Sequence, residues 1–167
     1  MRILSVCGSL QQKSGNLRLL LRAAALAPAG VELQLYDGLR DLPHFNPDLE
    51  QNGALPVVSA LREAVLQSDA LLIATPEYGH SLPGALKNAI DWLIGSGELE
   101  RKLCAITSFA PSAERGLRGL KALEDTLGAV SARVAFARPI VRGPSLDDEV
   151  AELLRSLIAG VAGLREP

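Results

Sequence analysis

The sequence predicts an α/β protein with three α/β/α layers, in which helices cover a doubly wound, five-stranded parallel sheet. Short apolar runs alternate five times with longer segments of helical periodicity, a pattern typical of a parallel sheet between helices. Three of these runs are almost continuously apolar, as expected of strands that are buried on both faces. Right-handed crossovers then favour a doubly wound arrangement, for which we choose the strand order 2-1-3-4-5.

The individual elements follow from these runs and from the signals at their ends. We expect strands over 2–7, 31–37, 69–75, 102–107 and 132–141. We expect helices over 16–27, 57–67, 83–94, 113–128 and 147–164. Ser145 can cap the last helix, whose first turn is acidic. Pro83 suits the first position of its helix, because an N–H group there has no intrahelical acceptor.

Length, composition and cysteine usage restrict the class of protein. The 167 residues are 48% hydrophobic and carry a formal net charge of −2, so we expect one globular domain over residues 1–167. The sequence has no apolar run of about 20 residues, no signal sequence and no basic stripe, so we expect no membrane or nucleic-acid partner. We also predict no metal site. Cys7 and Cys104 lie in strand-like runs and predict reduced core thiols in a cytoplasmic protein.

The loops that follow the strands are the expected place for a ligand. In doubly wound sheets, ligands bind at the carboxyl ends of the strands, near the switch point between the first and third strands. The loops to consider are therefore 8–16, 76–82 and 108–116. The connection over 38–56 is too long for a plain turn, and such loops are usually functional or mobile.

The first loop, GSLQQKSGN, contains the donors of an anion site. Free amides and the dipole at the start of the next helix attract an anion, and Lys13 can add a positive charge. The side chains that can also donate are Ser9, Gln11, Ser14 and Asn16. A phosphate monoester suits such a pocket. A capped helix and a surface turn would use the same residue types, so the loop alone leaves both interpretations open.

Cys7 allows another interpretation of this loop. Small tyrosine phosphatases place a cysteine at the strand end, then five residues, then Arg and Ser, and here Cys7 precedes Lys13 and Ser14 at that spacing. Lysine cannot form the planar, two-pronged clamp of arginine on a phosphoryl group. No acid for the leaving group is evident, so we keep the phosphatase as an alternative and interpret Cys7 as a core residue.

The second loop lies within ATPEYGHSLPGALKNAIDWL, residues 74–93. The residues that fix its backbone are Pro76, Gly79, Pro83 and Gly84. A stiff loop can present amides and aromatic rings to a flat ligand without the entropic cost of ordering, and Tyr78 and His80 would supply the rings. His80 has no evident carboxylate partner at short range. Glu77 can accept a hydrogen bond from the edge of a ligand ring, or it can cap a helix.

Both loops resemble those of the NAD(P)H-dependent FMN reductase family, which also contains quinone, chromate and azo-dye reductases. The family's first loop runs Gly-Ser-Leu-Arg-x-x-Ser-x-Asn, and its second runs Pro-Glu-Tyr-x-x-Ser-x-Pro-Gly-x-x-Lys-Asn-x-x-Asp-Trp. The corresponding stretches here are GSLQQKSGN and PEYGHSLPGALKNAIDW, and DLPHFNPDLE (41–50) resembles the family's long connection. The resemblance covers nearly the whole chain and implies a flavodoxin-like fold.

The resemblance implies FMN as the cofactor and a role for each loop. The FMN phosphate and ribityl chain would be held by Ser9, Gln11, Ser14, Asn16 and Leu17. The isoalloxazine ring would be lined by Pro76, Glu77, Tyr78, Gly79 and His80, with Ser108 closing its other side. The chain departs from the family in three places. Gln11 replaces the family arginine, which Lys13 would compensate; Gly79-His80 stands where Asn-Tyr is frequent; and the third loop lacks a glycine pair.

The implied activity is that of an FMN-dependent oxidoreductase. Hydride from NADPH or NADH would pass through the flavin to a quinone, flavin, azo or metal-oxyanion acceptor, without a catalytic side chain. The resemblance also implies a homodimer or homotetramer, with residues 44–46 reaching the partner's cleft and Trp92 either at the interface or in the core. A flavodoxin-like electron carrier without enzymatic activity is the other alternative, although such carriers are strongly acidic and lack the Pro-Glu-Tyr motif.

Overall fold

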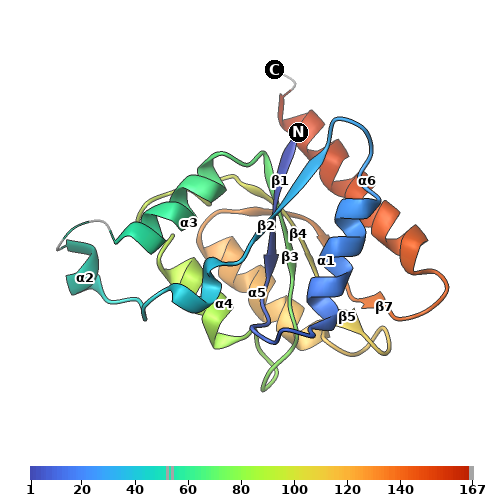
Figure 1. The fold of residues 1–167 in the computed structure, drawn as a ribbon, viewed down its shortest axis with the longest axis horizontal. Helices are drawn as coiled ribbons and strands as arrows, with labels where there is room; N and C mark the ends of the chain where they lie inside the picture. The colour runs from blue at the N-terminus through green and yellow to red at the C-terminus, as the bar shows by residue number, and fades with distance from the viewer. Residues whose placement is uncertain (52, 54, 166–167) are drawn as a thin grey trace.

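The computed structural model describes residues 1–51, 53 and 55–165 and is built around a five-stranded parallel sheet (Figure 1). Its strands are β1 (Arg2–Cys7), β2 (Glu32–Tyr36), β3 (Ala70–Ala74), β4 (Leu103–Thr107) and β6 (Arg133–Ala137). Their order is β2-β1-β3-β4-β6, so the predicted order 2-1-3-4-5 is confirmed with β6 as the fifth strand. Strands β3 and β4 are buried over their whole length, which explains why both are continuously apolar.

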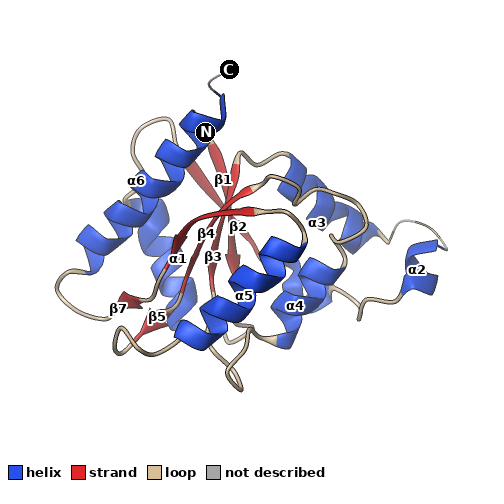
Figure 2. Cartoon of the chain, turned by 180° about the vertical axis from the view of Figure 1, so that it is seen from behind, coloured by secondary structure: helices blue, strands red, loops and turns tan. Residues whose placement is uncertain are grey.

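Helices cover both faces of the sheet and complete the three predicted layers (Figures 1 and 2). One face carries α1 (Gly15–Ala25) and α6 (Leu146–Arg165), and the other carries α3 (Pro56–Leu66), α4 (Gly84–Asp91) and α5 (Leu117–Ala129). Each pair of layers has its own apolar core. Leu72 and Ala105 of the sheet pack toward α1 and α6, whereas their neighbours Ile73 and Ile106 pack toward the other three helices. This alternation is the period of a β-strand.

The predicted strand over 132–141 is wrong as one element, because it divides at Pro139. Strand β6 ends at Ala137, and β7 (Ile140–Val141) begins after the proline. Proline has no N–H for the ladder and restricts the backbone of the preceding residue. Strand β7 instead pairs in parallel with β5 (Phe109–Ala110) in a separate two-stranded sheet. The segment after β4 therefore lies beside the segment after β6.

Two predicted helix starts also need correction. The helix predicted over 113–128 begins only at Leu117, directly after Gly116, whose φ of +93° is left-handed. Pro83 lies one position before α4, in an extended conformation, and not at its first helical position. Ser145 does precede α6, and its hydroxyl donates to the carboxylate of Glu149 at 3.1 Å.

The long connection over 38–56 contains a 3₁₀ turn, η1 (Gly38–Asp41), and a short helix, α2 (Pro47–Gln51); its residues 52 and 54 lie outside the described residues. Asn88 of α4 accepts from the Phe45 N–H at 2.7 Å and donates to the Pro43 carbonyl at 2.9 Å. The ring N–H of Trp92 donates to the same carbonyl at 2.8 Å, and Trp92 is only 1% exposed. Within this chain, Trp92 is thus a core residue that holds the connection in place.

Both cysteines are free thiols. Cys104 lies in the core of β4, and burial raises the pKa of its thiol to about 12, so the prediction of a core thiol is confirmed for this residue. Among the residues that the structure describes, no helix combines the length and the hydrophobicity needed to cross a lipid bilayer.

Candidate functional site

A cleft of about 320 Å³ lies at the carboxyl ends of the strands. The three predicted loops meet there, and eight of the eleven predicted cofactor residues line it: Ser9, Gln11, Ser14, Asn16, Pro76, Glu77, Tyr78 and Ser108. The other lining residues, which the sequence analysis did not name, are Gly15, Phe109, Ala110, Pro111, Arg115, Gly116 and Arg142. Motifs that are far apart in the sequence thus converge on one cavity.

Three predicted residues lie outside the lining of this cleft. Leu17 lines a separate cavity of about 90 Å³ together with Cys7 and Tyr36. Gly79 and His80 form the tip of the second loop, beyond the lining. For these three residues, the position in the structure does not support a direct contact with a ligand in the cleft.

The first loop caps α1 and directs the start of this helix toward the cleft. Ser14 is the N-cap residue, is 4% exposed, and accepts from the Leu17 N–H at 3.5 Å. The N–H groups of the first turn of a helix have no intrahelical acceptor, and Gly15 and Asn16 of this turn line the cleft. A helix cap and a set of anion donors therefore occur together here.

Asn16 joins the first loop to the third. Its side-chain oxygen accepts from the Phe109 N–H at 2.8 Å, so its amide nitrogen is the part that can donate to a ligand. A Cβ atom on Gly15 would lie only 2.9 Å from the Phe109 ring. Glycine at this position thus allows the ring to lie against the start of α1.

The second loop is held by a tight turn. Tyr78 and Ser81 exchange two backbone hydrogen bonds of 3.0 Å each. The two residues between them, Gly79 and His80, have φ values of +57° and +63°, as in a type I′ turn. The expected stiffness of this loop therefore comes from the turn as well as from its prolines.

Glu77 links this turn to α5 and caps that helix, which is one of the two roles expected for it. Its carboxylate accepts from the Gly119 N–H at 2.9 Å, and its other oxygen lies 3.2 Å from Nδ1 of His80. The expectation that His80 lacks a nearby carboxylate was therefore wrong. The Gly119 N–H, followed by His80, lowers the pKa of the Glu77 carboxyl below its ordinary value of 4.5.

Two arginines supply the positive charge of the cleft. Arg115 and Arg142 line it, whereas Lys13, the residue predicted to compensate for Gln11, is exposed and lies outside the lining. Arg115 lies within the predicted loop 108–116, so its charge was visible in the sequence. Arg142 directly follows the strand-like run over 132–141, and its place after a strand was the available signal.

Neither a nucleophilic thiol nor a metal cluster belongs to this cleft. Sγ of Cys7 lies 3.5 Å from the Ser9 carbonyl and 3.8 Å from Oγ of Ser14, and Cys7 is not among the lining residues. The phosphatase alternative thus lacks its nucleophile in the cleft. Within the described residues, no group of three or more His, Cys, Asp or Glu side chains could hold a metal ion.

The fold and the cleft define an α/β protein with a ligand site at the switch point of a doubly wound sheet. The sequence profile described as NADPH-dependent FMN reductase matches residues 1–141, and the chain belongs to that family.

Individual relatives show the same relationship. The chain is similar to an NAD(P)H-dependent FMN reductase of Pseudomonas aeruginosa, with 43% identity over 91 residues, which is 54% of this chain and 49% of that protein. It is also similar to a quinone reductase of Escherichia coli, with 38% identity over 94 residues, 56% of this chain and 50% of that protein. The chain thus spans about half the length of these curated relatives.

A solved structure matches over almost the whole chain. The structure is similar to that of FerB, a flavoenzyme NAD(P)H:(acceptor) oxidoreductase from Paracoccus denitrificans, with a TM-score of 0.82 and 26% identity. The match covers 95% of this chain and 97% of that one. The flavodoxin-like fold implied by the sequence is therefore confirmed.

Proposed function

We propose that this chain is an FMN-dependent NAD(P)H oxidoreductase that reduces small acceptors such as quinones, flavins, azo compounds or metal oxyanions. Membership of the NADPH-dependent FMN reductase family supports this proposal. The observation that carries it is the convergence of the first family motif, through residues 9–16, and the start of the second, residues 76–78, on one cleft at the switch point of the sheet.

The donors and surfaces of the cleft fit FMN. Its volume of about 320 Å³ lies within the range of small-molecule sites, roughly 300–1,000 Å³. Ser9, Ser14 and the first N–H groups of α1 are neutral donors of the kind that hold a phosphate. Pro76 and Tyr78 offer a flat surface to an aromatic ring, and Tyr78 is 56% exposed.

The chain's own residues bind and orient, while the cofactor carries the electrons. When bound, FMN supplies the redox chemistry by taking hydride from NADPH or NADH and passing electrons to an acceptor. Glu77 directs its two oxygens at the Gly119 N–H and at Nδ1 of His80. Its role is to hold the Tyr78 turn against α5. The exposed turn leaves room for the hydride donor and the acceptor to approach in succession.

We also propose a cytoplasmic homodimer or homotetramer in which residues 1–167 act as one flavin-binding domain. Helix α2 projects from the body of the fold (Figure 1) and has no buried residue. His44 and Asn46 beside it are exposed, so this segment is available to a partner chain. The free thiols of both cysteines are consistent with a reducing compartment.

Purified protein tests the function directly. After incubation with FMN and removal of the excess, it should be yellow, and NADPH or NADH should bleach it under anaerobic conditions. Bound flavin that neither nucleotide bleaches would favour the electron carrier. Colourless protein that hydrolyses p-nitrophenyl phosphate, and loses that activity in Cys7→Ala, would favour the phosphatase. Steady-state rates with both nucleotides and a panel of acceptors would then identify the substrates.

A further inference from the structure

Arg142 is a cation of the cleft that no carboxylate neutralises within the described part of the chain. Arg22, Arg62 and Arg138 form ion pairs there, whereas no ion pair among the described residues includes Arg142 or the other arginine of the cleft, Arg115. Its guanidinium carbon lies instead 5.2 Å from the centroid of the Phe109 ring. An arginine with a free charge at the wall of a polar cleft is suited to bind an anionic ligand.

The guanidinium of Arg142 lies beside the start of α1. A Cβ atom on Gly15, the first residue of this helix, would be 3.7 Å from a terminal nitrogen of Arg142. The backbone around it is fixed, because the Arg142 N–H donates to the Ala110 carbonyl at 3.0 Å in the pairing of β7 with β5. The charge of Arg142 and the donors of the first loop therefore lie together at the start of α1.

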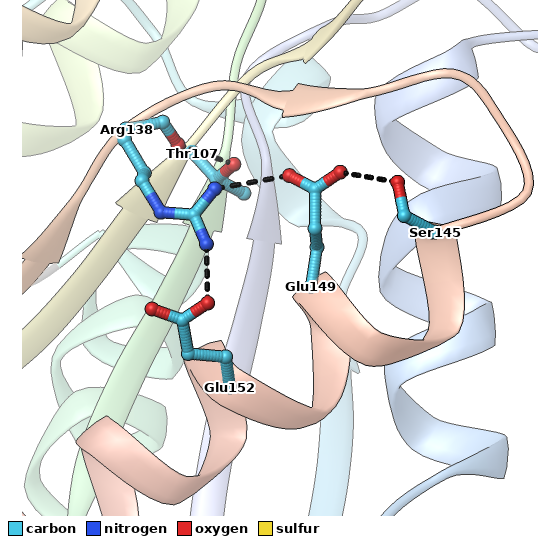
Figure 3. A network of polar contacts seen from close by, with 5 residues as sticks. All are labelled: Thr107, Arg138, Ser145, Glu149 and Glu152. Carbon is cyan, nitrogen blue, oxygen red and sulfur yellow. Dashed lines mark hydrogen bonds and ion pairs between the residues drawn. The ribbon is translucent and has the colours of Figure 1, made fainter.

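A polar network holds the segment that leads into β7 (Figure 3). The Thr107 hydroxyl at the end of β4 donates to the Arg138 carbonyl at 2.9 Å. The Arg138 guanidinium donates to Glu149 at 2.9 Å and to Glu152 at 2.6 Å, both on α6. These contacts hold the backbone between β6 and β7, which carries Arg142 to the wall of the cleft.

We propose that Arg142, and not a residue of the first loop, neutralises the phosphate of the bound flavin nucleotide. This inference rests on the proposed function. The position of the family arginine in the first loop holds Gln11, and Lys13 lies outside the cleft. Arg142 approaches the same helix start from the segment after β7, one residue beyond the segment that the family profile matches. Its planar guanidinium can form two parallel hydrogen bonds with a phosphate, which glutamine cannot.

Binding of FMN and riboflavin to the apoprotein tests this inference, because the two ligands differ only by the phosphate. Dissociation constants are measured from the quenching of flavin fluorescence at several salt concentrations. Arg142→Ala should weaken FMN binding about 10- to 100-fold, as expected for lost hydrogen bonds to a charged group, and should leave riboflavin binding unchanged. Its FMN affinity should also depend less on salt. Lys13→Ala removes the same charge from the neighbouring loop and should change neither affinity.

Two further variants keep the test decisive. Arg142→Met retains an unbranched stem against Phe109 and should show the same loss if Arg142→Ala fails to fold. Gln11→Arg in the Arg142→Ala background should recover most of the FMN affinity, because it restores a guanidinium in the first loop.

The possible failures of the two proposals are distinguishable. Wild-type protein that binds neither flavin would overturn the proposed function. If wild-type protein binds FMN and Arg142→Ala binds it with the same affinity, only the proposed role of Arg142 is overturned. A larger loss of FMN affinity in Lys13→Ala or Arg115→Ala than in Arg142→Ala would place the phosphate partner at that other residue.

Discussion

The contact between Glu77 and α5 gives a prediction that is independent of any ligand. Glu77→Ala removes the carboxylate that accepts from the Gly119 N–H in the first turn of this helix. It also removes the partner of His80 at the tip of the turn. The Tyr78 turn then loses its hydrogen bond to α5, and one N–H group of the helix loses its acceptor.

The expected cost follows from the kind of interaction that is lost. A hydrogen bond to a charged group contributes about 1.5–3 kcal/mol, and the loss of a helix cap costs about 0.5–2 kcal/mol. Both figures describe the same contact, so we expect a loss of about 2 kcal/mol in the free energy of unfolding. At about 2–4 °C per kcal/mol for a chain of this size, the Tm should fall by roughly 4–8 °C. Glu77→Gln keeps one acceptor oxygen and should lose about half as much.

Thermal unfolding of the apoprotein, followed by circular dichroism, measures this effect. Glu100→Ala is the matched control, because Glu100 is exposed and belongs to no ion pair among the described residues. Its Tm should stay within about 1 °C of the wild-type value. A Glu77→Ala variant that also stays within about 1 °C would refute the assignment of Glu77 as the cap of α5.

The same variant has a predictable pH dependence. The pKa of Glu77 is lower in the folded protein than its ordinary value of 4.5. Its stabilising contribution is therefore complete above that ordinary value, and it is lost as the pH falls through the lower folded value. The difference in Tm between wild type and Glu77→Ala should narrow as the pH falls below about 5. A difference that widens in acid would contradict the assignment.

Three further predictions concern the loops around the cleft. Ser14→Asp should keep α1 capped but weaken FMN binding at least about tenfold by placing a carboxylate beside the phosphate; an unchanged affinity in isothermal titration would put the phosphate elsewhere. Cys7→Ser should leave NADPH oxidation intact, and its complete loss in a folded variant would reopen thiol chemistry. Gly79→Asn should retain the wild-type Tm, because asparagine tolerates a positive φ. Gly79→Val should cost about 1–2 kcal/mol through backbone strain, and equal Tm values for the two variants would argue against the tight turn.

Periodicity was sufficient to predict the sheet but not the small sheet beside it. ALLIA and LCAIT are each buried on both faces, so their composition alone identifies two central strands. Strands β5 and β7 have two residues each and pair across a long separation in the chain. Such short strands carry no periodic signal, and only the break at Pro139 marks their place.

In the candidate site, the sequence pattern identified residues that line the cleft but not the long-range contacts of their side chains. The sequence motifs identified residues that line the cleft, because the ends of parallel strands meet at one edge of the sheet. The partner of Glu77 lies in a helix that begins 40 residues further along the chain. Local pattern therefore left ring contact and helix capping open for Glu77, and only the packing of α5 against the turn reveals the capping contact.

The position of Arg142 bears on what the replacement of the family arginine by Gln11 means. A phosphate needs neutral donors to fix its orientation and a cation to balance its charge, and these two needs can be met from different elements. In this chain the first loop supplies the neutral donors, and the segment after β7 brings the guanidinium to the same helix start. The cation that balances the phosphate is then supplied by Arg142, after β7, in place of an arginine at position 11 of the first loop.

On this proposal, Gln11→Arg alone should bring little gain in FMN affinity, whereas the same change should raise the FMN affinity strongly once Arg142 is removed. Such non-additivity between two residues far apart in the sequence is the signature of a shared ligand, and simple additivity would argue that they serve different groups.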